Sequence, residues 1–184
     1  MNGLIAMLLV ALAGVSCRAQ AVPAGVGPGS YTAIGVGIST YQSDYGKNTL
    51  KGLVLYSDVN FTWRLGMETT VRRSTHGAKQ DVVQSSYLAG LRCTLLPGRV
   101  QPYVKLSAGR GDITFPYIVA TGQYFVWASG AGVEIRAGPR VSLRIADFEY
   151  ENWPRFSFGA LHPYGFTMGM NYRLTRSRSM LSPR

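Results

Sequence analysis

Apolar and polar side chains alternate with a two-residue period along most of the chain after Tyr31. In the first such segment Ile34, Val36 and Ile38 share one face, while Ala, Gly and Ser occupy the positions between them. A period of two is the pattern of a β-strand, whose successive side chains point to opposite faces. The alternation recurs in seven later segments, so the chain is expected to form eight strands of about ten residues, the length of a tilted membrane strand.

The segments between these strands alternate in length. Three of them are tight turns, two of which contain Pro-Gly or Gly-Pro. Four longer segments lie between the turns. Short turns at one end and long loops at the other are typical of a membrane-spanning barrel, and both termini of the chain are then expected on the short-turn side. The turns are 60–63, 96–99 and 137–140, and the loops are 42–48, 74–81, 110–122 and 151–161. The predicted fold is therefore all-β, an eight-stranded antiparallel up-and-down transmembrane β-barrel.

Aromatic side chains are expected in rings at the two rims of this barrel, where amphipathic rings favour the boundary between membrane and water. The expected ring near the turns comprises Tyr31, Phe61, Trp63, Tyr103 and Tyr172. The expected ring near the loops comprises Tyr41, Tyr117, Tyr124, Trp127, Tyr150, Trp153, Phe156, Phe158 and Tyr164.

Composition favours the membrane over water. Only 15% of the 184 residues are charged, against roughly 25% in ordinary soluble proteins. The polar face of each strand consists mainly of Gly, Ser and Thr with one or two charges, which is typical of a crowded barrel interior rather than a solvated wall. After residue 21 no apolar run approaches the length of a spanning helix. A secreted soluble β-barrel remains the alternative fold.

The first 21 residues have the features of a secretory signal peptide. Leu4 to Val15 is an apolar run, and Ala19-Gln20-Ala21 is the small-x-small pattern of a cleavage site. A lipoprotein signal through Cys17 is the less favoured interpretation, because Gly14 stands where that motif prefers an aliphatic residue. Cleavage leaves Cys93 alone, so no internal disulfide is expected. The expected organisation is 1–21 signal peptide, 22–29 short N-terminal segment, 30–174 barrel and 175–184 basic periplasmic tail.

The chain carries 19 Lys and Arg against nine Asp and Glu, a net charge of +10. An exported chain whose basic residues form no stripe is a poor candidate for nucleic acid. Phosphates of anionic lipid, lipopolysaccharide above all, suit the excess better. The basic residues expected near the loops are Lys47, Arg73, Lys79, Arg110 and Arg155, while Arg176, Arg178 and Arg184 lie in the tail.

Charged side chains on the polar face are expected to meet inside the barrel, because side chains fill an eight-stranded interior. The predicted structural network contains Asp58, Arg64, Glu68, Arg92, Lys105, Glu134 and Arg144. A proton or ion path through these groups is the alternative interpretation. Asp147 and Glu149 break the alternation, which indicates a β-bulge or the end of the membrane segment.

The last strand resembles the assembly signal of outer-membrane barrels. It places polar, small, hydrophobic and terminal residues at the required spacing in Thr167, Gly169, Tyr172 and Leu174. With the eight strands, this resembles the family that contains the OmpA transmembrane domain and OmpX-like proteins, over residues 30 to 174. Leu174 replaces the usual terminal Phe, and a basic tail follows. The resemblance implies a monomer in the outer membrane of a Gram-negative bacterium, inserted by the barrel assembly machinery.

Candidate catalytic residues are few. Ser74 and His76 lie two residues apart near a loop, where a lipid A hydrolase would need a serine and a histidine. His162 has no second His nearby, so neither a metal nor another cofactor is expected. Arg110-Gly111-Asp112 spells an adhesion tripeptide that common residues produce by chance. We therefore expect a non-enzymatic barrel that contributes envelope integrity or surface contact through its loops, with the hydrolase as the alternative.

Overall fold

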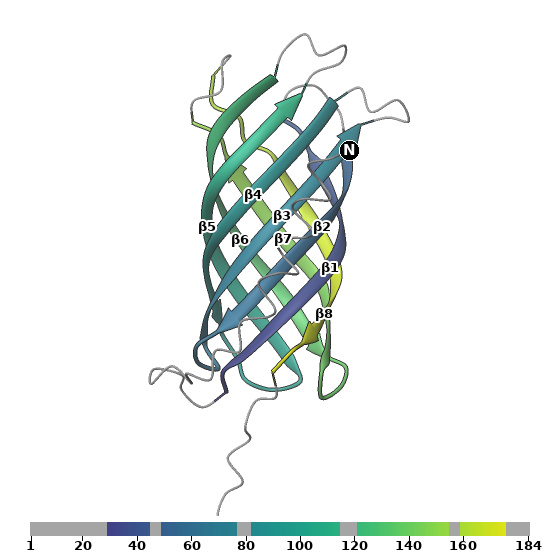
Figure 1. Cartoon of the computed structure of the whole chain (residues 1–184), viewed down its shortest axis with the longest axis vertical. Helices are drawn as coiled ribbons and strands as arrows, with labels where there is room; N and C mark the ends of the chain where they lie inside the picture. Colours follow the sequence, from purple (N-terminus) through teal and green to yellow (C-terminus); the bar gives the residue numbers. More distant parts are fainter. Residues whose placement is uncertain (1–28, 45–48, 77–81, 115–120, 155–158, 176–184) are drawn as a thin grey trace, which may run out of the picture.

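The computed structural model describes residues 29–44, 49–76, 82–114, 121–154 and 159–175. Its strands form one closed antiparallel barrel in chain order, with β1 joined to β8 (Figure 1). This confirms the predicted fold. The strands are β1 (Tyr31–Gln42), β2 (Thr49–Asn60), β3 (Leu65–His76), β4 (Val82–Thr94), β5 (Val100–Thr114), β6 (Thr121–Arg136), β7 (Val141–Asn152) and β8 (Tyr164–Arg173).

The proposed signal peptide, residues 1–21, and all of the tail after Thr175 lie outside the described residues. Across the described ranges no helix is long and apolar enough to cross a membrane. The β1–β8 seam pairs Gly37 with Gly169. A side chain at Gly37 would lie 2.3 Å from the Met168 carbonyl oxygen, so glycine permits the close approach that shuts the barrel. Closure leaves no unpaired strand edge facing lipid.

The strands are longer than the sequence pattern suggested, running from 10 to 16 residues. β3 extends to His76 and β5 to Thr114, so the loops expected at 74–81 and 110–122 shrink to 77–81 and 115–120. The Arg110-Gly111-Asp112 tripeptide therefore lies within β5 and not in a loop. Its Arg110 and Asp112 pair with each other at 2.7 Å. The strand ends on either side of the long connections still lie at one end of the barrel, and the tight turns lie at the other, where β1 begins and β8 ends (Figure 1).

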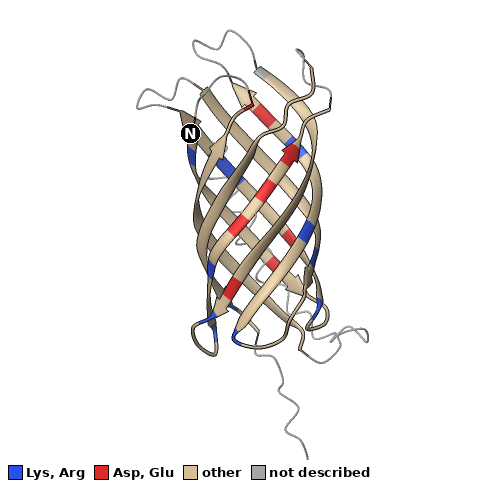
Figure 2. Ribbon diagram, turned by 180° about the vertical axis from the view of Figure 1, so that it is seen from behind, with Lys and Arg blue, Asp and Glu red and all other residues tan. Residues whose placement is uncertain are grey.

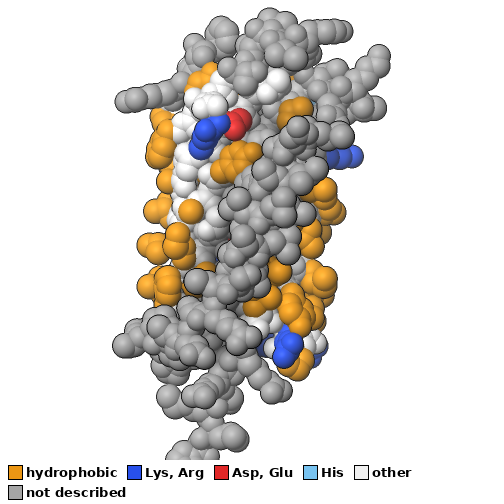
Figure 3. Space-filling view, viewed as in Figure 1, with side chains coloured by type: hydrophobic (Ala, Val, Ile, Leu, Met, Phe, Trp, Pro, Cys, Tyr) orange, Lys and Arg blue, Asp and Glu red, His pale blue; other side chains and the backbone are white. Residues whose placement is uncertain are grey.

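The outward face of the barrel is apolar, as the alternation predicts. Ile38 and Leu53 are each 65% exposed, and hydrophobic side chains project along both sides of the described wall (Figure 3). A wall of this kind suits hydrocarbon and not water, which excludes the soluble barrel considered from the sequence.

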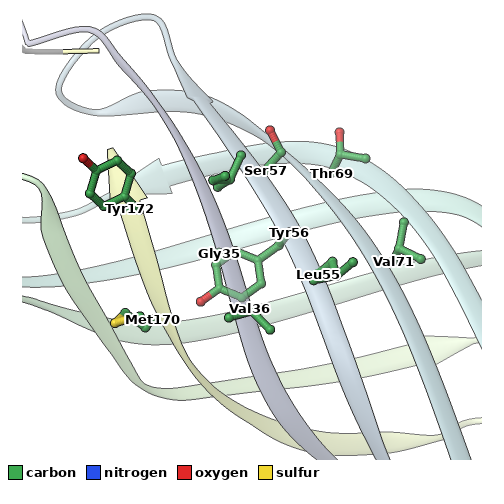
Figure 4. Close-up of a pocket in the computed structure, with 10 residues that line it drawn as sticks. Gly35, Val36, Leu55, Tyr56, Ser57, Thr69, Val71, Met170 and Tyr172 are labelled. Carbon is green, nitrogen blue, oxygen red and sulfur yellow. The ribbon is translucent and has the colours of Figure 1, made fainter. Parts of the chain in front are cut away.

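A shallow depression of about 520 Å³ interrupts this wall where β8, β1, β2 and β3 lie side by side (Figure 4). Val36, Leu55 and Met170 line it, so its surface is apolar. At its centre the ring of Tyr56 packs across Gly35 from the inside, where a side chain on Gly35 would lie 2.2 Å from the ring. The depression thus belongs to the lipid-facing wall.

A β-bulge interrupts β7. Arg144 lies opposite Gly169 of β8, and the next pairs resume at Asp147 and Thr167, so two residues of β7 face one residue of β8. Ile145 is exposed and Ala146 partly so, whereas Arg144 and Asp147 are both buried. The break in alternation at Asp147 is therefore a bulge within the strand.

Candidate functional site: a charged network in the lumen

The interior of the barrel contains a buried cluster of ionised side chains, here called the lumen network. Each member lies on the inward face of its strand, and none is more than 6% exposed. Lys, Arg, Asp and Glu lie on several strands in the middle of the barrel (Figure 2). The lumen network consists of the acidic Asp58, Glu68, Glu134, Asp147, Glu149 and Glu151 and the basic Arg72, Arg92, Lys105 and Arg144.

Two arginines organise the half of the lumen network nearer the turns. Arg92 lies 2.9 Å from Asp58 and also contacts Glu134. Arg144 lies 2.7 Å from Glu68 and 3.0 Å from Asp147. Charge-assisted hydrogen bonds of this kind offset the cost of taking both ions out of water.

Lys105 on β5 joins this half to the half nearer the loops. Its Nζ lies 2.7 Å from Asp147, 2.8 Å from Glu149 and 3.1 Å from Glu68. Beyond it, Arg72 contacts both Glu149 and Glu151. One connected set of ion pairs therefore runs along the lumen from Asp58 to Glu151.

The lumen network holds two more acidic than basic groups, and neutral donors serve the additional carboxylate oxygens. Asn171 Nδ2 donates to Glu134 at 2.7 Å. The Tyr41 hydroxyl donates to Glu149, and Trp153 Nε1 donates to Glu151, each at 2.9 Å. A buried carboxylate without such partners would be strongly unfavourable.

Aromatic rings cover three of the buried arginines from within the lumen. The guanidinium carbons of Arg72, Arg92 and Arg144 lie 3.8 to 3.9 Å from the ring centres of Tyr41, Tyr103 and Tyr56 respectively. Tyr41 and Tyr103, assigned to the outer rims from the sequence, thus face inward, as does the fully buried Trp153. Their position along a strand is near a rim, but the parity of the alternation directs them into the barrel.

An apolar cluster fills the inward face towards the loops, beside the charged groups. Trp153 lies at its edge, bridging to Leu161 across the β7–β8 connection. Gly111 faces the indole, where any side chain would come within 2.2 Å of the ring. The other buried members are Val82, Leu88, Ile113, Val126 and Ala128.

The structure brings together six of the seven charged residues predicted to meet inside the barrel. The exception is Arg64, which precedes β3 in an exposed turn and lies 4.4 Å above the Trp63 ring. The expectation was wrong because strand parity was extended into a turn. Sequence reasoning missed four members of the lumen network: Arg72, Asp147, Glu149 and Glu151.

The residues of the resembled assembly signal occupy both faces of the last strand. Thr167 is buried inside the barrel, while Tyr172 and Leu174 are exposed on the outside. Gly169 faces the Tyr56 hydroxyl, which a side chain would approach to 2.6 Å. Recognition by the assembly machinery remains a prediction.

The two residues considered for hydrolysis do not form a catalytic pair. Ser74 is buried in the lumen with 2% of its surface exposed. His76 Nδ1 lies 3.2 Å from the Thr49 carbonyl oxygen. No hydrogen bond joins Ser74 to His76 in the described chain, so the contact by which a histidine would activate the hydroxyl is missing there.

A metal site is not supported by the described residues either. His162 Nδ1 lies 3.1 Å from the Asn152 amide, and its ring stacks on Tyr150. Among the described residues no group of three or more His, Cys, Asp and Glu is arranged to hold a metal ion. Cys93 is a free thiol on the outward face of β4.

Two solved structures share this architecture. Neisserial surface protein A matches with a TM-score of 0.64 and 13% identity, covering 78% of this chain and 96% of its own. Ail, the attachment invasion locus protein of Yersinia pestis, solved in complex with the heparin analogue sucrose octasulfate, matches with a TM-score of 0.54 and 18% identity, covering 79% and 99%. Identities this low are evidence for the fold alone.

Sequence comparison identifies the family. No curated protein matches the chain significantly. The profile of the outer membrane protein beta-barrel domain, however, matches residues 7–173. With a closed eight-stranded barrel and an apolar outer wall, this chain belongs to the outer-membrane β-barrel family.

Proposed function

We propose that this protein is a non-enzymatic component of the outer membrane that stabilises the envelope and makes surface contacts through its loop end. The observation that carries the proposal is the filled lumen. From Asp58 to Glu151 the lumen contains ionised side chains that pair with one another, and aromatic rings that cover three of the arginines. Side chains that pair inside the lumen stabilise the barrel wall. Contacts with other molecules are then expected at the outer surface.

Lipopolysaccharide is the partner that the outer surface suits best. Lys51, Arg73 and Arg110 are exposed on the outward face, within five residues of the loop ends of β2, β3 and β5. In outer-membrane barrels the long loops are extracellular, so these side chains lie at the depth of the outer-leaflet head groups. Cations there attract phosphate groups.

A comparison of two triple variants tests this contact. The loop-end variant carries Lys51→Gln, Arg73→Gln and Arg110→Gln. The matched control carries Arg64→Gln, Arg99→Gln and Arg140→Gln, which removes three exposed charges at the turn end. In nanodiscs containing lipopolysaccharide, we expect a higher Tm for wild type and control than in phosphatidylcholine nanodiscs, and most of that rise should vanish in the loop-end variant. Equal loss in both triples would contradict a contact at the loop end.

An experiment in bacterial cells tests the enzymatic alternative. Bacteria that express the wild-type chain are expected to show lipid A of unchanged mass, while cells lacking the protein become more sensitive to detergent. A wild-type-dependent loss of an acyl chain, abolished by Ser74→Ala, would favour the hydrolase instead.

A second prediction concerns conduction. The interior of an eight-stranded barrel is only wide enough for side chains, and here those side chains are paired. Purified protein in planar bilayers should therefore show no large, steady pore, whereas a sixteen-stranded porin in the same bilayers provides the positive control. Porin-sized current steps that disappear after the protein is boiled would contradict the filled lumen.

A further inference from the structure

A small cavity lies inside the barrel mouth at the turn end. Its volume is about 220 Å³. Arg136 from the end of β6 and Arg173 from the end of β8 line it, together with Gln101, Tyr31 and Trp63. The cavity is separate from the lumen network, whose nearest members, Asp58 and Glu134, lie deeper in the barrel.

Arg173 is unusual among the buried cations of the described chain. Only 6% of its surface is exposed. Its Nε and Nη2 atoms have no hydrogen-bond partner, and its guanidinium carbon lies 4.2 Å from the Tyr31 ring centre. The four buried cations of the lumen network each contact at least one carboxylate, but no ion pair to Arg173 occurs within the described ranges. Nε of Arg136 is likewise buried without a partner.

The nearby negative charge is already paired with other groups. Glu134, two residues before Arg136, already contacts Arg92, Ser142 and Asn171. The described turns at this mouth, residues 61–64, 95–99 and 137–140, contain no Asp or Glu. They do carry three exposed arginines, and basic positions gather at this end of the barrel (Figure 2). These arginines are Arg64, Arg99 and Arg140.

We propose that this cavity is a binding site for a phosphate group. Two guanidinium groups with free N–H donors match a phosphate in both charge and hydrogen-bond geometry, because each guanidinium can hold two oxygens. The Gln101 carboxamide supplies a further donor. The exposed Trp63 places the site at the depth where aromatic rings meet lipid head groups. The phosphate can come from a phospholipid head group of the inner leaflet or from a free periplasmic phosphate.

The site is tested with the full chain folded in dodecyl maltoside, a detergent without phosphate. Inorganic phosphate is titrated by calorimetry at constant ionic strength, and the gel-mobility shift between unheated and boiled samples verifies folding. We expect one saturable site per chain, weakened by about tenfold or more in Arg173→Gln and in Arg136→Gln, because each loses charge-assisted hydrogen bonds. Arg99→Gln is the control, since it removes an exposed arginine of the same end that does not line the cavity.

The result overturns the proposal if wild type shows no saturable binding, or if Arg99→Gln weakens binding as much as the two cavity variants. Should Arg173→Gln fail to fold, the partly exposed Arg136 still provides the comparison. Repeating the titration in phospholipid nanodiscs distinguishes the two sources. If a lipid head group occupies the cavity in nanodiscs, the binding of inorganic phosphate seen in detergent should be abolished there. If the site takes free phosphate, the binding should be retained.

Discussion

Lys105→Met is expected to lower the free energy of unfolding by about 3 to 5 kcal/mol, the cost of breaking a buried ion pair by removing one partner. The change preserves most of the side-chain volume but leaves three carboxylates, those of Glu68, Asp147 and Glu149, without their shared cation. Because the lumen network already contains more acidic than basic groups, the loss of a cation increases the imbalance. Urea unfolding in phosphatidylcholine vesicles, followed by tryptophan fluorescence, measures the effect.

Lys51→Met provides the matched control, since it makes the same chemical change on the exposed face of β2. Its effect should stay within about 0.5 kcal/mol, as for other surface substitutions. Adding Asp147→Asn to Lys105→Met should restore part of the loss by removing one of the three carboxylates that contacted Lys105. If Lys105→Met and Lys51→Met were equally mild, the lumen network would not contribute to stability.

The second large effect is expected on the opposite face of the same strand. Leu106 is 61% exposed near the middle of β5, between Leu91 of β4 and Ser129 of β6. Leu106→Arg should destabilise the folded protein in lipid by about 2 to 4 kcal/mol, the cost of a cation near the bilayer midplane. The measurement is the same unfolding experiment in vesicles.

Leu96→Arg tests whether depth in the membrane, and not exposure, determines this cost. Leu96 is 59% exposed, nearly as much as Leu106, but lies in the turn between β4 and β5. A cation there remains in contact with water, so the expected change is within about 1 kcal/mol. Leu143 is the third residue of β7, so the destabilisation caused by Leu143→Arg should fall between those of Leu106→Arg and Leu96→Arg. Equal costs at all three positions would contradict the assigned membrane span.

The sequence was sufficient to predict the fold because two regularities coincide in it: the two-residue alternation of apolar and polar side chains, and the alternation of short turns with long loops. Residues such as Phe166 and Met168 alternate with small or polar residues along β8, and alternation at this period decides both strand and face. Loop boundaries were less well predicted. The residues around Gly111 are small or polar, as in a loop, yet the segment belongs to β5. There Gly111 makes room for the Trp153 ring.

The lumen network was predicted only in part, for identifiable reasons. Arg72 has the same parity as Glu68, so the alternation already placed it inside the barrel, although it was left out of the predicted set. Asp147 and Glu149 break the alternation, which indicated either a bulge or the end of the membrane segment, and only a bulge places these residues and Glu151 in the lumen. Which ions then pair depends on contacts across the lumen between strands far apart in the sequence, such as Lys105 with Asp147. Alternation alone carries no information about such pairs.

The bulge in β7 acts on the strand as a frameshift acts on a reading frame. Before it, even-numbered residues such as Ser142 and Arg144 face the lumen, and after it odd-numbered residues do. Without the additional residue, Asp147, Glu149 and Glu151 would face lipid. A single-residue insertion or deletion inside a strand therefore exchanges the environments of all side chains beyond it, while the same change in a loop exchanges none. Lineages of such barrels should consequently vary in length in their loops, and should change strand length by one residue only where a bulge absorbs it.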